Sequence, residues 1–236
     1  MANFPSIAKY IGHRGAPVHA PENTIASLRK AKELGATWIE FDVRLTQNGQ
    51  PIIMHDNTLN RTTNGRGKVA KTPFSDMANL DAGEGQQVPL LDRWLRVAAE
   101  LNLGVNIEIK ESALRATEVA LQVYQALQKS WTPDLPSPLV SSVVAKNLLA
   151  YRTLDPAMAL ALIVTSWPWG CLSKLKAVDA SALVIRANSI NAKRVKKLHD
   201  AGYKVLVYTV NKASEAQKLF DMGVDSVFTD DLTICG

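Results

Sequence analysis

The chain has 236 residues, of which 47% are hydrophobic and 21% charged, a composition typical of a globular protein with one large or two small domains. A chain of this length can bury a core without disulfides, and Cys171 and Cys235 show no metal-binding spacing, which fits a reducing compartment. The net charge of +5 permits an anionic partner. Its densest basic run falls in an expected helix without any nucleic-acid-binding module, so we expect no nucleic-acid partner.

The N-terminal segment lacks the charged and apolar regions of a secretory signal, and no apolar run approaches the roughly 20 residues that a membrane crossing needs. We therefore expect a cytoplasmic protein without stable membrane association. The sequence does not determine the oligomeric state, and a homo-oligomer stays open.

Short apolar runs alternate with longer amphipathic stretches along the whole chain. The runs predict eight strands, at Ile7–Gly12, Thr37–Val43, Gly104–Ile109, Leu139–Ser141, Ala159–Val164, Ala182–Arg186, Lys204–Tyr208 and Ser226–Thr229. The amphipathic stretches predict seven helices, at Thr24–Leu34, Leu91–Leu101, Leu114–Gln128, Ala145–Leu154, Cys171–Ala177, Asn191–Ala201 and Ala213–Met222. Only a short tail follows the eighth strand, so the last helix should be short or absent.

Eight strands that alternate with helices indicate a parallel sheet, and this number in a chain of this length favours a closed TIM (β/α)8 barrel. An open dinucleotide-binding sheet is less favoured because no GxGxxG motif follows the first strand. We expect one catalytic domain over residues 1–236. Residues 44–90 are too long for an ordinary loop and predict a small insertion after the second strand, with Pro51–His55 as its most strand-like part.

Three acidic residues end two of the predicted strands. Glu40 and Asp42 are two residues apart and share one strand face, and Glu108 ends the strand expected beside them. Isolated acids at such positions often pair only with lysines or loop amides. Three carboxylates at the active-site end of a barrel need a compensating cation, and hard oxygen ligands suit Mg²⁺ or Ca²⁺ better than zinc. We predict a divalent cation site here.

Two histidines and two cations accompany these acids. His13 and Arg14 end the first strand, and His55 follows an apolar run in the insertion. An imidazole titrates near neutrality and is a candidate acid or base, although a single strand-end histidine is more often structural. Arg14 and Lys110 carry the charges that bind phosphate oxygens, which makes a phosphate ester the expected substrate class.

The segment Pro21–Thr24 (PENT) precedes the first helix. Asn23 or Thr24 can cap that helix, and this structural role is the safer half of the interpretation. Glu22 and Asn23 could in addition brace the metal site and His13 from behind.

These motifs together resemble the glycerophosphodiester phosphodiesterase family, in particular its short cytoplasmic bacterial branch. The resemblance covers nearly the whole chain and comprises these ordered segments: HRG at 13–15, PENT at 21–24, IEFDVRLTQNGQPIIMHD at 39–56, RTTNG at 61–65, PLL at 89–91, NIEIK at 106–110, LVSS at 139–142, YTVN at 208–211 and GVDSVFTD at 223–230. Two departures border the expected alcohol or glycerol pocket. Tyr208 stands where the family often has tryptophan, and residues 186–188 (RAN) stand where close relatives carry a His-Leu-Asn-like segment.

The resemblance implies a TIM barrel with an insertion after the second strand and a metal-dependent hydrolase. It assigns metal ligands to Glu40, Asp42 and Glu108, the two catalytic histidines to His13 and His55, and phosphate contacts to Arg14 and Lys110, with Tyr208 as a further substrate contact. The implied reaction converts a glycerophosphodiester to sn-glycerol 3-phosphate and an alcohol.

Two alternatives stay open. One is a phospholipase-like enzyme of the same barrel type acting on lipid phosphodiesters, for which Trp167 and Trp169 are the only hint; we expect them instead to line the pocket or to pack locally. The other is a catalytically silent module that binds phosphate compounds, against which both intact histidines and all three acids argue.

Overall fold

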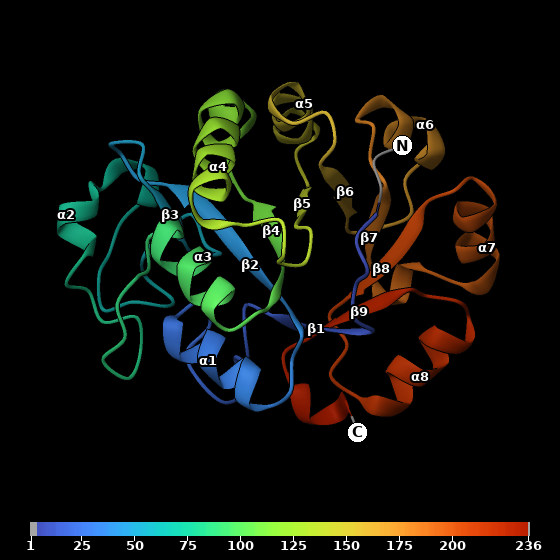
Figure 1. Cartoon of the computed structure of the whole chain (residues 1–236), viewed down its shortest axis with the longest axis horizontal. Coiled ribbons are helices and arrows are strands. Elements are labelled where there is room, and N and C mark those ends of the chain that lie inside the picture. The colour runs from blue at the N-terminus through green and yellow to red at the C-terminus, as the bar shows by residue number, and fades with distance from the viewer. Residues whose placement is uncertain (1–3, 236) are drawn as a thin grey trace.

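The computed structural model describes residues 4–235. It contains eight parallel strands, which are β1 (Tyr10–His13), β2 (Trp38–Leu45), β4 (Gly104–Ile109), β5 (Leu139–Ser142), β6 (Ala159–Val164), β7 (Ala182–Arg186), β8 (Lys204–Tyr208) and β9 (Ser226–Thr229). Each pairs with its neighbour in the order β1-β9-β8-β7-β6-β5-β4-β2, and a β1–β2 pairing closes the ring. The predicted TIM barrel is therefore confirmed (Figure 1).

Helices surround the ring, as Figure 1 shows. They are α1 (Ile25–Glu33), α3 (Leu91–Glu100), α4 (Ala116–Ser130), α5 (Ala145–Leu154), α6 (Cys171–Ala177), α7 (Ala192–Asp200) and α8 (Ala213–Asp221). A short 3₁₀ turn at Leu232–Cys235 follows the last strand, as expected for a reduced last helix. None of the helices in this part of the chain combines the length and hydrophobicity that a membrane crossing requires.

The predicted boundaries agree with the structure to within one or two residues at most elements. The first strand is the exception: it begins at Tyr10, and the sequence-based start at Ile7 is wrong. The reason is pairing, because the register of β1 on β9 begins at Tyr10, opposite Val227. Ile7 and Ala8 are apolar enough to suggest a strand, but this register begins after them.

Alternation along the strands separates two cores. Side chains such as Phe41 and Ile107 point outward and pack under the helices, whereas Ile11, Val184 and Leu206 point into the barrel. The Trp38 indole fills the end of the barrel away from the strand C-termini. Gly104 makes room for it, because a Cβ at that position would collide with the indole.

The insertion lies beside β2, where it adds the antiparallel strand β3 (Pro51–Ile53) and the helical turn α2 (Phe74–Met77) (Figure 1). It has a small core of its own, separate from the barrel, built from Ile52, Met54, Leu59, Val69, Met77, Ala82 and Val88. The predicted strand extended to His55, but pairing ends at Ile53. Met54 packs in the insertion's core, and His55 after it lines the cavity.

Asp225 ties α7, β8 and the start of β9 together. Its carboxylate accepts hydrogen bonds from Lys204 Nζ (2.8 Å) and the Val205 N–H (2.8 Å), and lies 2.8 Å from His199 Nε2. Burial raises the pKa of Asp225, but these partners lower it more, so the net pKa lies below the usual value.

We expect Asp225→Asn to lower the free energy of unfolding at pH 7 by about 1–2 kcal/mol, because it removes charge-assisted hydrogen bonds. The native pKa is depressed, so this stabilisation is present above the unfolded-state pKa of roughly 3.9 and is lost as the pH falls through the native value. Urea unfolding at pH 7 and near pH 3 measures both. Asp200→Asn is the control: Asp200 pairs only with exposed Lys196, and a loss there as large as for Asp225 would contradict the argument.

Candidate active site

The three predicted acidic residues meet at the C-terminal end of the barrel strands. Glu40 and Asp42 lie on β2, Glu108 lies on β4, and the strand register sets Asp42 opposite Glu108. All three side chains are buried, and they offer carboxylate oxygens that lie within 4.8 Å of one another. The convergence predicted from strand ends and residue parity is therefore present.

This crowding shifts the pKa values of the three acids in different directions. Burial and the nearby Asp42 and Glu108 carboxylates raise the pKa of Glu40 well above its usual value. Burial and Asp42 likewise raise the pKa of Glu108. Burial also acts to raise the pKa of Asp42, but Lys110 and Arg14 outweigh it and the net pKa falls. One member of the cluster is thus held ionised while its neighbours resist ionisation in the absence of a further cation.

The arrangement of the oxygens fits a divalent cation. Asn23 donates to Asp42 Oδ2 (2.8 Å) and the Arg14 N–H donates to Glu40 Oε2 (3.0 Å). The second oxygen of each carboxylate, Glu40 Oε1 and Asp42 Oδ1, is buried and makes no hydrogen bond, although Lys110 Nζ lies 3.4 Å from Asp42 Oδ1. Each carboxylate is thus oriented through one oxygen, and the other could bind a hard divalent cation such as Mg²⁺ or Ca²⁺.

Two cations border this cluster. Lys110 Nζ lies 2.8 Å from Glu108 Oε1 and 3.4 Å from Asp42 Oδ1. The Arg14 guanidinium lies 2.9 Å from Glu22 and 3.5 Å from Asp42. Arg14 adopts a left-handed backbone conformation (φ 56°), unusual for a residue with a side chain, and its own N–H reaches Glu40 in that conformation.

His13, the last residue of β1, faces the acidic cluster. Its Nε2 lies 3.9 Å from Glu40 Oε2, and its Nδ1 lies 2.7 Å from Asp230 Oδ1, just after β9. Asn211 donates to the other oxygen of Asp230 (2.8 Å). Burial acts to raise the pKa of Asp230, but His13 and Asn211 lower it more, so the net pKa falls. An ionised Asp230 at Nδ1 favours the tautomer that leaves Nε2 free towards the cavity.

His55 has the same kind of support from the insertion. Its Nδ1 lies 2.7 Å from Asp56 Oδ1. Arg61 donates to both oxygens of Asp56 (2.8 and 3.0 Å) and to both oxygens of Glu22 (2.7 and 2.8 Å). Burial lowers the pKa of His55, although the charge of Asp42 acts in the opposite direction. The net lowering favours the neutral imidazole.

The expected support from the PENT segment needs one correction. Asn23 braces Asp42 as predicted, and Thr24 caps α1 through a hydrogen bond from the Ser27 N–H. Glu22, however, braces neither the carboxylate cluster nor His13. Its carboxylate is taken up by Arg14 and Arg61, because these two guanidinium groups flank it.

Four supporting residues were not assigned from sequence, namely Asp56, Arg61, Asn211 and Asp230. Each lies within a segment that carries the family resemblance, which was the available signal. For Asp56, the only further signal in the sequence was its position directly after His55. Asp230 lies 217 positions from His13, and only closure of the barrel brings the two together.

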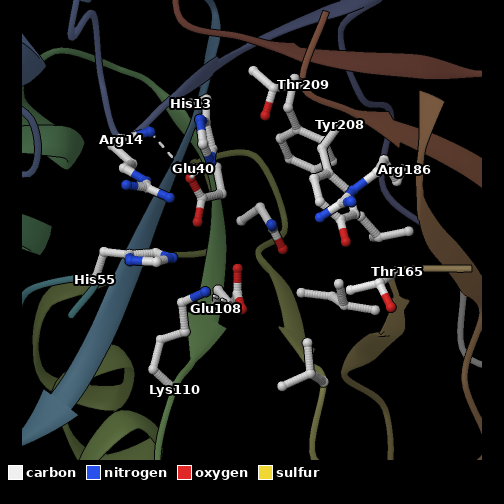
Figure 2. A pocket seen from close by; sticks show the side chains of 15 residues that line it. His13, Arg14, Glu40, His55, Glu108, Lys110, Thr165, Arg186, Tyr208 and Thr209 are labelled. Carbon is white, nitrogen blue, oxygen red and sulfur yellow. Dashed lines mark hydrogen bonds and ion pairs between the residues drawn. The ribbon is translucent and has the colours of Figure 1, made fainter. Parts of the chain in front are cut away.

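These groups open into a cavity of about 320 Å³ (Figure 2). Figure 2 shows His13, Glu40, His55, Glu108 and Lys110 along one side and Tyr208, Arg186 and Thr165 along the other. Tyr208 lines the cavity, and its hydroxyl donates to the Val164 carbonyl (3.2 Å). Its role as a substrate contact stays a prediction. Asn106 is a buried residue of the cavity lining, and its side-chain amide oxygen, Oδ1, accepts no hydrogen bond.

The two tryptophans of the SWPWG loop do not line the cavity, contrary to one of the two expectations for them. Trp167 packs locally, with the Arg194 guanidinium 5.0 Å from its ring centre. Trp169 does neither, because 96% of its surface is exposed.

Known proteins share this fold. The family model for the glycerophosphoryl diester phosphodiesterase family matches residues 13–234. The chain belongs to this family. It is 31% identical to the uncharacterized protein YqiK of Bacillus subtilis, with 95% of each chain covered. It is 29% identical to a glycerophosphodiester phosphodiesterase of Caldanaerobacter subterraneus, with 94% of this chain and 93% of that one covered.

A solved structure provides a further likeness within the family. The phosphodiesterase of Oleispira antarctica, in complex with its product sn-glycerol-3-phosphate, is 34% identical and superposes with a TM-score of 0.94. The match covers 97% of this chain and 96% of that one. Membership of the family makes the chain an enzyme of the phosphoric diester hydrolase class.

Arg61 should affect catalysis although it does not line the cavity. We expect Arg61→Ala to lower kcat by roughly 10²-fold, because it releases Asp56 behind His55 and Glu22 behind Arg14, and a misplacement of about 1 Å has an effect of that size. Steady-state kinetics measures it. Arg66→Ala, on an exposed part of the same insertion, is the matched control. Equal kinetics in the two variants would show that the Arg61 network does not position the site.

Proposed function

We propose that this enzyme hydrolyses glycerophosphodiesters to sn-glycerol 3-phosphate and an alcohol, with a bound divalent cation and His13 and His55 as acid and base. The observation that carries the proposal is the pairing of two imidazoles with a three-carboxylate cluster in one cavity. Each imidazole has an aspartate at Nδ1, which leaves its Nε2 for proton transfer. The product bound to the Oleispira enzyme supports the substrate class.

Glu40, Asp42 and Glu108 would hold the cation, with Asn23 fixing the orientation of Asp42. When bound, Mg²⁺ or Ca²⁺ would polarise a phosphate oxygen and lower the pKa of the glycerol 2-hydroxyl. Lys110 and Arg14 lie beside this cluster, so their donors are available to the charge that develops on the phosphate oxygens.

His13 would remove the proton of the glycerol 2-hydroxyl as its oxygen bonds to phosphorus. The bond from phosphorus to the alcohol oxygen breaks, and His55 would give that oxygen a proton. The cyclic phosphate is then opened at the 2-oxygen by water, with the two histidines in reversed roles. We assign His13 as the first base because its Nε2 faces the carboxylates.

A second candidate substrate class is lipid phosphodiesters. The observation that favours it is the exposure of Trp169 (96%) and Leu114 (97%), on loops that follow β6 and β4 at the rim of the cavity end. A lysophospholipid in the substrate panel distinguishes the two classes. A silent binding module is disfavoured because both histidines, all three acids and their supports are in place. The cytoplasmic location and the homo-oligomer stay predictions.

We expect His13→Ala and His55→Ala each to lower turnover of glycerophosphoethanolamine by on the order of 10²–10⁴-fold, the usual contribution of a general acid or base. Phosphorus NMR measures the loss and identifies the phosphate product. His19→Ala is the control, since His19 contacts Asp231 outside the cavity. Losses below tenfold in both cavity variants, with the fold intact, would remove the proton-transfer roles.

Removal of the cation should abolish turnover, and Mg²⁺ or Ca²⁺ should restore it. Glu40→Gln should weaken cation binding by more than roughly tenfold in calorimetry, since it removes a ligand rather than a group behind one. The metal-free variant should be at least as thermally stable as metal-free wild type, because a buried like-charge contact is relieved. Glu118→Gln, whose carboxylate pairs with Arg115 outside the cavity, is the control. Full activity in excess chelator would refute the cation.

A further inference from the structure

The wall of the cavity opposite the carboxylates has a different chemistry. It is formed by the ends of β6, β7 and β8 and presents Thr165, Arg186, Tyr208 and Thr209 above the apolar Ile163 and Val184. Arg186 is the one charged residue of this wall in the part of the chain that the structure describes.

Arg186 reaches the cavity because of strand parity. It is the last residue of β7, two positions after Val184, whose side chain points into the barrel, and one after Ile185, whose side chain packs outward. The register sets it beside Tyr208 of β8. Figure 2 shows its guanidinium directed into the cavity, across from Glu108 and His55.

The charge on Arg186 is not matched by a nearby acid. Arg14 lies 2.9 Å from Glu22, and Lys110 lies 2.8 Å from Glu108. Within residues 4–235, no carboxylate lies within 4.0 Å of Arg186, in contrast to these two other cations of the cavity. An arginine fork that faces a cavity without a counter-ion is suited to receive a carboxylate from a ligand.

We propose that Arg186 binds a carboxylate on the alcohol portion of the substrate, so that the enzyme prefers glycerophosphodiesters of a carboxylate-bearing alcohol such as serine. This inference rests on the proposed function. The phosphate itself is served by Arg14, Lys110 and the cation site on the other wall, and free glycerol carries no charge. The alcohol is thus the part of the substrate that can supply an anion to Arg186.

The hydroxyls of Thr165 and Thr209 line the same wall. They can accept or donate hydrogen bonds and would complete a polar environment for an amino-acid-like group. A cationic group without a carboxylate, such as choline, would meet the guanidinium as a like charge. The wall therefore separates alcohols by charge, while the opposite wall acts on the shared phosphate.

The test compares kcat/KM for glycerophosphoserine and glycerophosphoethanolamine, two substrates that differ only by the carboxylate. We expect wild type to prefer the serine diester by roughly 10- to 100-fold, the usual range for a hydrogen-bonded charge. Arg186→Gln should reduce this ratio to near one, and Arg186→Lys should restore part of it, because it keeps the charge but not the fork. Arg194→Gln, which changes the same charge outside the cavity, should keep the wild-type ratio.

The outcomes separate this inference from the proposed function. Loss of turnover by the same factor for both substrates in Arg186→Gln would mean that Arg186 binds the phosphate or glycerol, and would overturn the proposal. A wild-type ratio near one would overturn it as well, while the hydrolase function stands. Absence of turnover for both diesters and for glycerophosphoglycerol would overturn the proposed function, and this inference with it.

Discussion

Three carboxylates buried at the ends of two adjacent strands are the constraint on which the rest of the site depends. Taken alone they repel: burial and the neighbouring carboxylates raise the pKa of Glu40 and Glu108, while Lys110 and Arg14 lower that of Asp42. Arg14 and Lys110 supply part of that charge, and a cation bound by the oxygens of Glu40 and Asp42 that make no hydrogen bond would supply the rest.

Each histidine is oriented by residues from a segment that is distant in sequence from the carboxylates or lies in the insertion. His13 is oriented by Asp230, which directly follows β9, the strand paired with β1. Asn211, after β8, holds Asp230 in turn. His55 is oriented by Asp56 and Arg61 of the insertion. Arg61 also reaches Glu22 and thereby Arg14, so one chain of charged contacts joins the insertion to the residue that we propose binds phosphate. The insertion therefore contributes His55 to the cavity, together with the residues that orient it.

The two walls of the cavity divide the work. One wall presents the histidines, the acids and Lys110, the groups that we propose act on the phosphate. The other presents neutral hydroxyls and the unmatched charge of Arg186, which only some alcohols can satisfy. Under these two proposals, chemistry and selectivity reside on different strands, so that a change of residue at the end of β7 would alter substrate preference without disturbing the carboxylates.

The sequence by itself determined the alternation of strands and helices, the barrel, the position of the insertion and five residues that meet at one end of the barrel. It could do so because strand parity and the common direction of parallel strands fix which ends and faces meet. The tertiary structure decided what local pattern does not encode: the start of β1, the aspartate behind each histidine, the true partners of Glu22 and the exposure of Trp169. Those features depend on contacts between residues far apart in the chain, such as His13 and Asp230, which exist only once the barrel has closed.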